Sequence, residues 1–267
     1  MPLMLLRNVT INSTILYTSA FLLTTILHEL GHGITGALLG SDPILHHNFV
    51  EHGSVDHLSP HRQIAIALAG PAVSLLQGFV AGLVFLKSQK RSLFELFVLW
   101  WSVLGFANFL GYLMIGPIFS VGDIGKAYSI AGTPLWVQIS LAVVGAALLL
   151  LVAYKMSSPF LQFSSRAEWI EDGTARKRFS LRTLILPWIV GSAIITVLYL
   201  PIIAVVSIIY PVMSGMVFIF PWQNAVNVRD IQPASDSAIE RISTVAVVLL
   251  AIVAGVFRLI LAPGIPL

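Results

Sequence analysis

Long apolar runs limit what this chain can fold into more than any other feature of its sequence. The first run extends from about Ile11 to Leu39 and contains no Lys, Arg or Asp. A helix needs about 20 predominantly apolar residues to cross the hydrocarbon core of a bilayer. The mean hydropathy of the whole chain is +0.90 and 10% of its residues are charged, outside the range of soluble domains. The sequence therefore predicts an all-α, polytopic membrane protein with about six transmembrane helices. We expect spans at about Ile11–Leu39, Gln63–Leu86, Leu93–Val121, Leu135–Tyr154 and Ile242–Leu261, with a kinked fifth span and a re-entrant or interfacial piece in the proline-interrupted run Thr183–Trp222.

The distribution of charge divides the chain into three parts. Residues 1–154 contain four spans and would form the membrane-embedded core, residues 155–182 a basic cytoplasmic loop, and residues 183–267 the C-terminal membrane helices. Cytoplasmic loops of membrane proteins carry an excess of Lys and Arg. Ten of the 15 Lys and Arg residues are Arg7 or lie in the 87–91 turn and the 155–182 loop. We therefore expect a multi-pass protein with a cytoplasmic N-terminus, and we expect no nucleic-acid partner.

The sequence HELGH at residues 28–32 places two histidines and a glutamate inside the first apolar run. Histidines four residues apart lie on one face of a helix, where both can bind one zinc ion. Polar groups are costly within a membrane unless they are satisfied, so these residues indicate either a function or a satisfied structural cluster. On the functional interpretation His28 and His32 are metal ligands, and Glu29 is placed to accept a proton from an attacking water.

A third metal ligand has to come from elsewhere in the chain. The sequence has no cysteine, so a zinc ion would be held by His, Asp or Glu. Asp123 follows the third expected span, and the glycines and Pro117 near it allow the helix to unwind there. A solvated acid at a helix end is the alternative interpretation. Spans one and three run in the same direction, however, so Asp123 and the two histidines are expected on the same side of the membrane.

Two histidines, one carboxylate and an open fourth position are typical of catalytic rather than structural zinc. Such an ion lowers the pKa of water to about 7, and Glu29 could take up that proton and return it to a leaving amine. This chemistry indicates peptide hydrolysis. Because the site would lie within the lipid bilayer, we expect the substrate to be a transmembrane segment of another protein, unwound from its helix.

Three motifs support this reading in a fixed order along the chain: HELGHG with Ala37, then Ala69-Gly70-Pro71, then Pro117 to Asp123. Over about residues 20–125 they resemble the site-2 protease family of intramembrane zinc metalloproteases. The resemblance implies a three-helix catalytic core with one catalytic Zn²⁺, in which Glu29 is the catalytic acid/base. Ser74 stands where the family usually has Asn. The residues that the resemblance assigns are the zinc ligands His28, His32 and Asp123 and the substrate-binding residues Asn108, Gly70, Pro71 and Ser74.

A membrane zinc transporter or metal sensor is the alternative from another class of function. Residues 41–61 contain five of the seven histidines and could form a solvated loop, a second metal site, a pH-sensitive gate or a substrate-guiding flap. Transport predicts ligands in both halves of the membrane and a continuous polar path. The last three expected spans contain almost no acids or histidines, so the sequence favours the enzyme.

Overall fold

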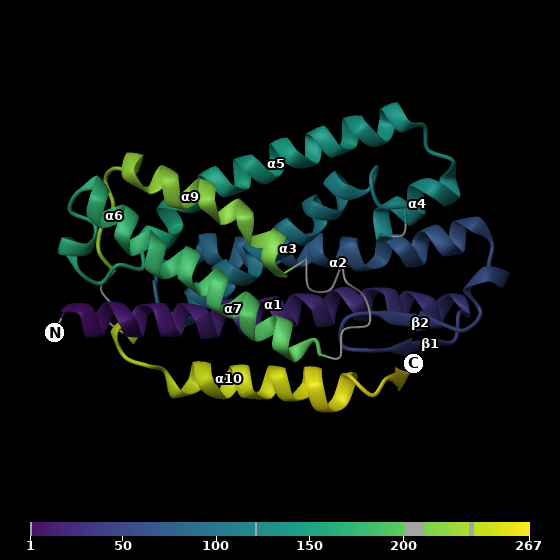
Figure 1. Ribbon diagram of the computed structural model, residues 1–267, viewed down its shortest axis with the longest axis horizontal. Coiled ribbons are helices and arrows are strands. Elements are labelled where there is room, and N and C mark those ends of the chain that lie inside the picture. Colours follow the sequence, from purple (N-terminus) through teal and green to yellow (C-terminus); the bar gives the residue numbers. More distant parts are fainter. Residues whose placement is uncertain (1, 121, 201–210, 235–237) are drawn as a thin grey trace.

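The computed structural model describes residues 2–120, 122–200, 211–234 and 238–267. Among these residues, six helices are long and apolar enough to cross a membrane (Figure 1). The prediction of an all-α polytopic protein with about six such helices is confirmed. The six candidate spans are Met4–Leu39, Pro60–Lys87, Leu93–Ile115, Leu135–Leu161, Gly173–Leu198 and Thr244–Leu261.

The connections between the helices differ in length: residues 40–59 separate the first two α-helices, whereas residues 88–92 separate the second and third. The described residues include two π-helical turns, at Leu181–Ile185 and at Val256–Leu261. The α-helices are α1 (Pro2–Leu39), α2 (Pro60–Lys87), α3 (Leu93–Ile115), α4 (Asp123–Ala131), α5 (Leu135–Leu161), α6 (Gly173–Ser180), α7 (Leu186–Leu198), α9 (Ile219–Asn224) and α10 (Thr244–Gly255). Short 3-10 helices occur at Val55–His57, Ala167–Trp169, Gly215–Phe218, Ala225–Asn227 and Ala238–Glu240.

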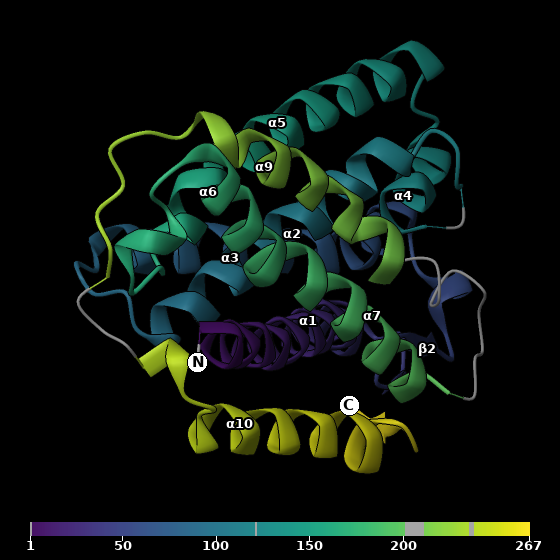
Figure 2. The ribbon, with the colours of Figure 1, turned by 60° about the vertical axis from the view of Figure 1, so that its left-hand side comes forward.

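Helix α1 is the centre of the bundle and packs against α2, α3, α7 and α10 (Figure 2). Several threonine and serine hydroxyls of α1 donate to carbonyls one turn earlier in the same helix, whereas other polar side chains are satisfied by distant segments. The Asn12 side-chain amide donates to the carbonyls of Ile239 and Arg241 at 3.0 and 2.6 Å. The Ser13 hydroxyl donates to the carbonyl of Thr183 at 2.8 Å. Pro187, four residues later, has no N–H to donate to that carbonyl.

Small residues bring α2 and α3 into backbone contact. A Cβ atom added at Gly105 on α3 would lie 2.6 Å from the Ser74 carbonyl oxygen and 2.7 Å from the Gly78 nitrogen on α2. One added at Gly82 would lie 3.0 Å from the Ser102 hydroxyl. Small residues at this spacing let transmembrane helices approach closely. The spacing of Gly78 and Gly82 in the sequence therefore marks a helix–helix contact, and this contact fixes α2 beside α3.

Replacing Gly105 with Ala should lower the thermal stability of the purified protein. The new methyl group would overlap backbone atoms that cannot move aside, and such overpacking costs about 1–3 kcal/mol. Gly111 on the same helix is the matched control, because nothing lies within 4 Å of its added Cβ. We expect G111A to be neutral or stabilising, since Ala favours helix over Gly by about 1 kcal/mol. Equal unfolding midpoints for the two variants would contradict the close packing.

A small sheet lies at the end of the bundle opposite the N-terminus (Figure 1). Strand β1 (Pro43–Leu45) pairs in antiparallel fashion with β2 (Val50–His52) and with β3 (Ile265–Pro266), giving the order β2-β1-β3. The expected polar loop at residues 41–61 is therefore a β-hairpin followed by a 3-10 turn. The hairpin rests on the last turns of α1, where a Cβ added at Gly36 would lie 2.8 Å from the His52 ring.

Two expected boundaries at the start of the chain and after the third span differ from the structure. Residues 2–10 were expected to precede the first span, but α1 begins at Pro2, and Asn8 donates to the Glu240 carbonyl at 2.9 Å. The third span was expected to reach Val121, which lies outside the described residues. Helix α3 ends at Ile115, and Pro117, with its fixed φ and missing N–H, stands two residues beyond it.

The basic segment 155–182 was expected to be a loop, and this prediction is wrong for most of its length. Helix α5 continues to Leu161, and a new helix starts at Gly173, so the connection comprises residues 162–172. The Asp172 side chain accepts from the Ala175 N–H at 2.7 Å, an N-cap that starts α6 before the cluster of basic residues. The fifth span, Gly173–Leu198, thus includes Arg176, Lys177, Arg178 and Arg182, and it contains the π-helical turn at Leu181–Ile185. The region 201–210 of the expected re-entrant piece lies outside the described residues.

Candidate metal centre

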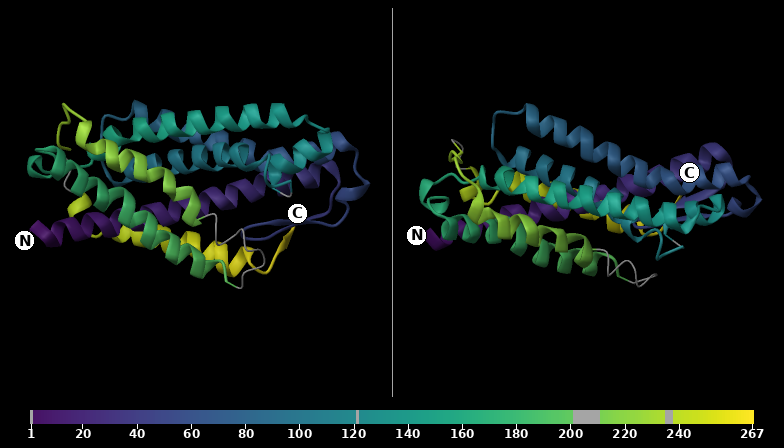
Figure 3. Two further views of the ribbon diagram at one scale, coloured as in Figure 1. Left: turned by 45° about the horizontal axis from the view of Figure 1, so that its top comes forward. Right: turned by 90° about the horizontal axis from the view of Figure 1, so that it is seen from above.

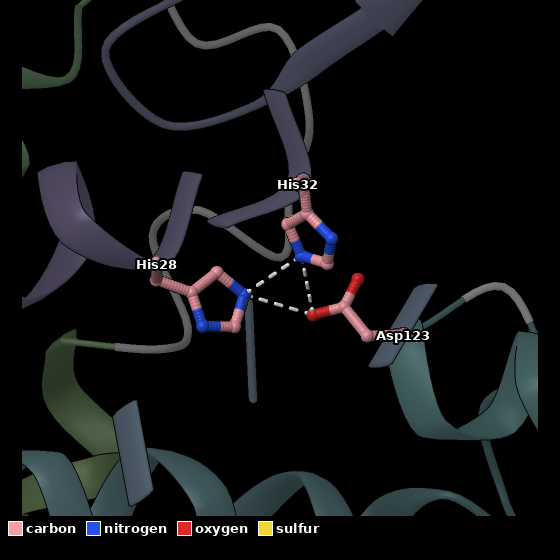
Figure 4. Close-up of side chains that lie close together, drawn as sticks. All are labelled: His28, His32 and Asp123. Atoms are coloured by element: carbon pink, nitrogen blue, oxygen red, sulfur yellow. Dashed lines mark hydrogen bonds and ion pairs between the residues drawn. The ribbon is translucent and has the colours of Figure 1, made fainter. Parts of the chain in front are cut away.

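Three side chains from two distant parts of the chain meet beside α1 (Figure 4). The Nε2 atoms of His28 and His32 lie 3.1 Å apart. One carboxylate oxygen of Asp123, Oδ2, lies 2.9 Å from His28 Nε2 and 3.4 Å from His32 Nε2. Both histidines are buried. Within the described parts of the chain this is the single group of three or more His, Asp or Glu residues that could hold a metal ion.

The opposite edge of each imidazole is held by a partner. His32 Nδ1 lies 2.7 Å from the Ile66 carbonyl, which can only accept, so Nδ1 carries the proton and donates it. His28 Nδ1 lies 3.1 Å from the Ser74 hydroxyl, which can accept in the same way. A proton at Nδ1 leaves a lone pair on Nε2, the tautomer that a metal ligand needs. Both rings are therefore oriented with Nε2 toward the Asp123 carboxylate.

The donor set fits a zinc ion. Tetrahedral zinc has ligand bonds of about 2.0–2.2 Å to nitrogen and oxygen, which place two ligand atoms about 3.3 Å apart. The three separations of 2.9, 3.1 and 3.4 Å are close to this value. Two neutral imidazoles and one carboxylate are ligands that zinc accepts, and they leave a fourth position open. His28, His32 and Asp123 could therefore hold a metal ion without any rearrangement of the helices.

A glycine on α2 lets the backbone approach the ligand atoms. A Cβ atom added at Gly70 would lie 2.3 Å from His32 Nε2 and 2.8 Å from His28 Nε2. Gly31 on α1 contacts the same turn of α2, since a Cβ atom added there would lie 2.9 Å from the Ala69 carbonyl oxygen. Pro71 follows within α2 and has no N–H to donate to the Ala67 carbonyl. Ala67 is next in the chain to Ile66, whose carbonyl accepts from His32. Gly70 and Pro71 therefore belong to the turn of α2 that faces the ligands.

Asp123 reaches the site from the first turn of α4 rather than from the end of α3. After Ile115 the chain turns back, and the Phe119 carbonyl lies within contact distance of Gly125, where no side chain would fit. The partial positive charge at the N-terminus of α4 favours the ionised carboxylate. The expected convergence of Asp123 with His28 and His32 is observed, and Asp123, expected at the end of the third span, is the first residue of the separate helix α4.

Glu29 lies beside the three ligands without being one of them. It is buried and near enough to interact electrostatically with His28, His32 and Asp123. Its position three residues before His32 puts it on the adjoining face of α1, about one helical turn away.

The remaining expected site residues lie on α2 and α3. Asn108 is buried on α3, one turn before Tyr112, whose ring stacks on His28 with the centroids 5.3 Å apart. Ser74 hydrogen-bonds His28, as described above. Nothing in the sequence distinguished Tyr112 or the Ile66 carbonyl from other residues of their helices, because both act through contacts between separate spans.

The histidine-rich hairpin forms no second metal group among the residues described. His47 is buried edge-on against the stacked rings of Tyr199 and Phe257, and burial together with the charge of Arg258 lowers its pKa to about 4. Burial likewise lowers the pKa of His52 to about 4. Both rings are therefore neutral at physiological pH. They pack the hairpin against the bundle, and neither changes its charge between pH 5 and pH 8.

Replacing Ser74 with Ala should weaken zinc binding by about 10–100-fold, the usual effect of removing a partner that orients a metal-binding histidine. The His28 ring would lose the acceptor that fixes its tautomer. Ser102 is a matched control, because it is also buried between α2 and α3 but donates to the Gly78 carbonyl at 2.8 Å. Competition with a chromogenic zinc chelator measures both variants. Unchanged zinc affinity with reduced activity in S74A would instead place Ser74 on the substrate.

Comparisons with protein-family models, curated proteins and solved structures find no match to this chain. Functional interpretation therefore depends on the geometry of the site itself.

Proposed function

We propose that the protein is an intramembrane zinc metallopeptidase that hydrolyses a peptide bond in or near a transmembrane segment of another membrane protein. One observation carries the proposal: two imidazole Nε2 atoms and a carboxylate oxygen lie 2.9–3.4 Å apart, with a second carboxylate, Glu29, beside them. The resemblance of the three motifs to site-2 proteases supports the same reading.

Each residue of the site would have a distinct role in the proposed reaction. His28, His32 and Asp123 would hold the ion, and Ser74 and the Ile66 carbonyl would keep the two rings in the tautomer that binds it. A bound zinc ion supplies a polarised water and stabilises negative charge on the peptide carbonyl. Glu29 would accept a proton from that water at its carboxylate and return it to the departing amine.

The location of the site indicates the class of substrate. His28 and His32 lie within a candidate spanning helix and are buried by α2, so a soluble protein would have no direct approach. A transmembrane segment can reach the site through the bilayer. Its helix has to unwind locally, because a helical peptide group is hydrogen-bonded and shielded by its neighbours.

The orientation follows from the charges at the two ends of the bundle. Arg241 lies beside the start of α1, where its carbonyl accepts from Asn12, and Arg229 lies between Val226 and Ala234, which hydrogen-bond Arg176 and Ser164. Twelve of the fifteen Lys and Arg residues therefore belong to segments at the end of the bundle that holds the N-terminus, the end marked N in Figure 3. The three others are Arg62, Lys126 and Arg258. From the positive-inside rule we infer a cytoplasmic N-terminus and a metal centre nearer the opposite face of the membrane.

A reconstituted assay tests the proposal. The purified protein is placed in liposomes with a panel of single-span membrane proteins, and products are mapped by mass spectrometry. We expect cleavage within or next to a span, loss of cleavage after zinc is removed with a chelator, and recovery when zinc is restored. Zinc uptake is measured in the same vesicles. Zinc uptake without any cleavage would contradict the proposed peptidase and would support a zinc transporter instead.

A further inference from the structure

A second site lies far from the metal centre, at the end of the bundle that holds the N-terminus. Helix α5 packs there against α9 and the turn that follows it (Figure 1). A cavity of about 220 Å³ opens between them. Its polar lining residues are Tyr154, Lys155, Ser157, Ser158, Asn224 and Asn227.

The lining offers one cation and several hydrogen-bond donors. The side-chain amide of Asn224 donates to the Ser157 hydroxyl at 3.1 Å, and that of Asn227 donates to Asn224 Oδ1 at 3.3 Å. No acid lines the cavity, and no carboxylate of the described residues forms an ion pair with Lys155. An ammonium with neighbouring amides and hydroxyls suits an anion with several oxygen acceptors, such as a phosphate group.

An apolar track leads along α5 to this cation. Val144, Leu148 and Leu151 are 50%, 44% and 51% exposed, and Lys155 continues the same helical stripe. At 1.5 Å per residue, the stripe from Val144 to Lys155 is about 16 Å long, roughly half of the 30 Å hydrocarbon core. The stripe thus matches one leaflet. Tyr154, 58% exposed beside Lys155, is the kind of residue found at a membrane–water interface.

We propose that this site binds an anionic phospholipid from the leaflet at the N-terminal end. The lipid phosphate is held by the Lys155 ammonium and the donors of the cavity, and an acyl chain lies along the Val144–Leu148–Leu151 stripe. The basic excess of this end attracts the same class of lipid. The site is separate from the metal centre and does not depend on the proposed peptidase activity.

Native mass spectrometry of the detergent-solubilised full chain tests the proposal. Phosphatidylglycerol and phosphatidylcholine with identical acyl chains are titrated into the wild type and into K155Q, K155R and K90Q. Lys90 is a matched control, since it is an exposed cation of the same end that does not line the cavity. We expect one tightly bound phosphatidylglycerol, about tenfold weaker binding in K155Q, near-normal binding in K155R and no change in K90Q.

Further measurements distinguish a lipid phosphate from a soluble phosphate ester, and a bound lipid from a bound peptide span. Glycerol 3-phosphate carries the same charged group without acyl chains and should not displace the lipid at equal concentration. If glycerol 3-phosphate displaced the lipid, the proposed ligand would be a soluble phosphate ester and not a phospholipid. Equal binding of phosphatidylcholine, equal losses in K155Q and K90Q, or occupation of the stripe by a peptide span in place of lipid would each overturn the proposal as well.

Discussion

Replacing Glu29 with Gln should reduce peptide-bond cleavage by about 10²–10⁴-fold while the protein still binds one zinc ion. Gln has nearly the same shape as Glu but cannot accept a proton from water at neutral pH. Since the ligands His28, His32 and Asp123 are unchanged, the metal centre should remain intact. Turnover of a transmembrane substrate in liposomes and zinc content per chain are measured on the same preparation.

The control for this variant is E51Q. Glu51 lies on β2 with its side chain 66% exposed, and it is removed from the ligands. We expect E51Q to cut at the wild-type rate. An E29Q protein that keeps cutting would exclude Glu29 as the proton acceptor. Loss of zinc from E29Q would show instead that Glu29 is a ligand or is needed to assemble the centre.

Replacing Asp123 with Asn should remove zinc from the purified protein and, with it, all cleavage. The change deletes the one anionic ligand, and a neutral amide oxygen does not replace a carboxylate that lies 2.9 Å from His28 Nε2. The loss of affinity should exceed the about 10–100-fold effect of removing a residue that only orients a ligand. Elemental analysis after dialysis against a weak chelator measures the zinc retained.

D56N is the companion variant, because Asp56 is an exposed acid in the 3-10 turn before α2. It should retain one zinc ion per chain and full activity. If D123N also retained zinc with wild-type affinity, the ligand set proposed here would be wrong. If D123N lost zinc but still cut its substrate, the metal would have no part in the reaction.

The spacing within each helix was enough to predict part of the site. His28 and His32 share a face because they are four residues apart, and Asp123 could be expected nearby because spans one and three run in parallel. The hydrogen bonds that orient the two rings could not be predicted. The Ile66 carbonyl and the Ser74 hydroxyl come from another helix, and only the packing of α2 on α1 selects them.

Helix boundaries were predicted least well where polar residues are satisfied by distant segments. Asn8 was expected to precede the first span, but it lies within α1 and donates to a carbonyl 232 residues away, as the neighbouring Asn12 does to one 227 residues away. The basic residues of α6 concealed a helix that begins at the Asp172 cap. The local sequence shows how polar a segment is. It does not show which distant residues will hydrogen-bond its polar side chains, because that depends on how all the helices pack.

The contact between Gly70 and the two imidazoles also decides from which direction the metal centre is accessible. A Cβ atom added at Gly70 on α2 would lie 2.3–2.8 Å from the imidazole nitrogens, so α2 leaves no room for another molecule on that side. An incoming polypeptide therefore has to meet the ion from the side facing away from α2. Because α2 blocks one side of the metal centre, the peptide bond of a substrate would approach the ion from a single direction.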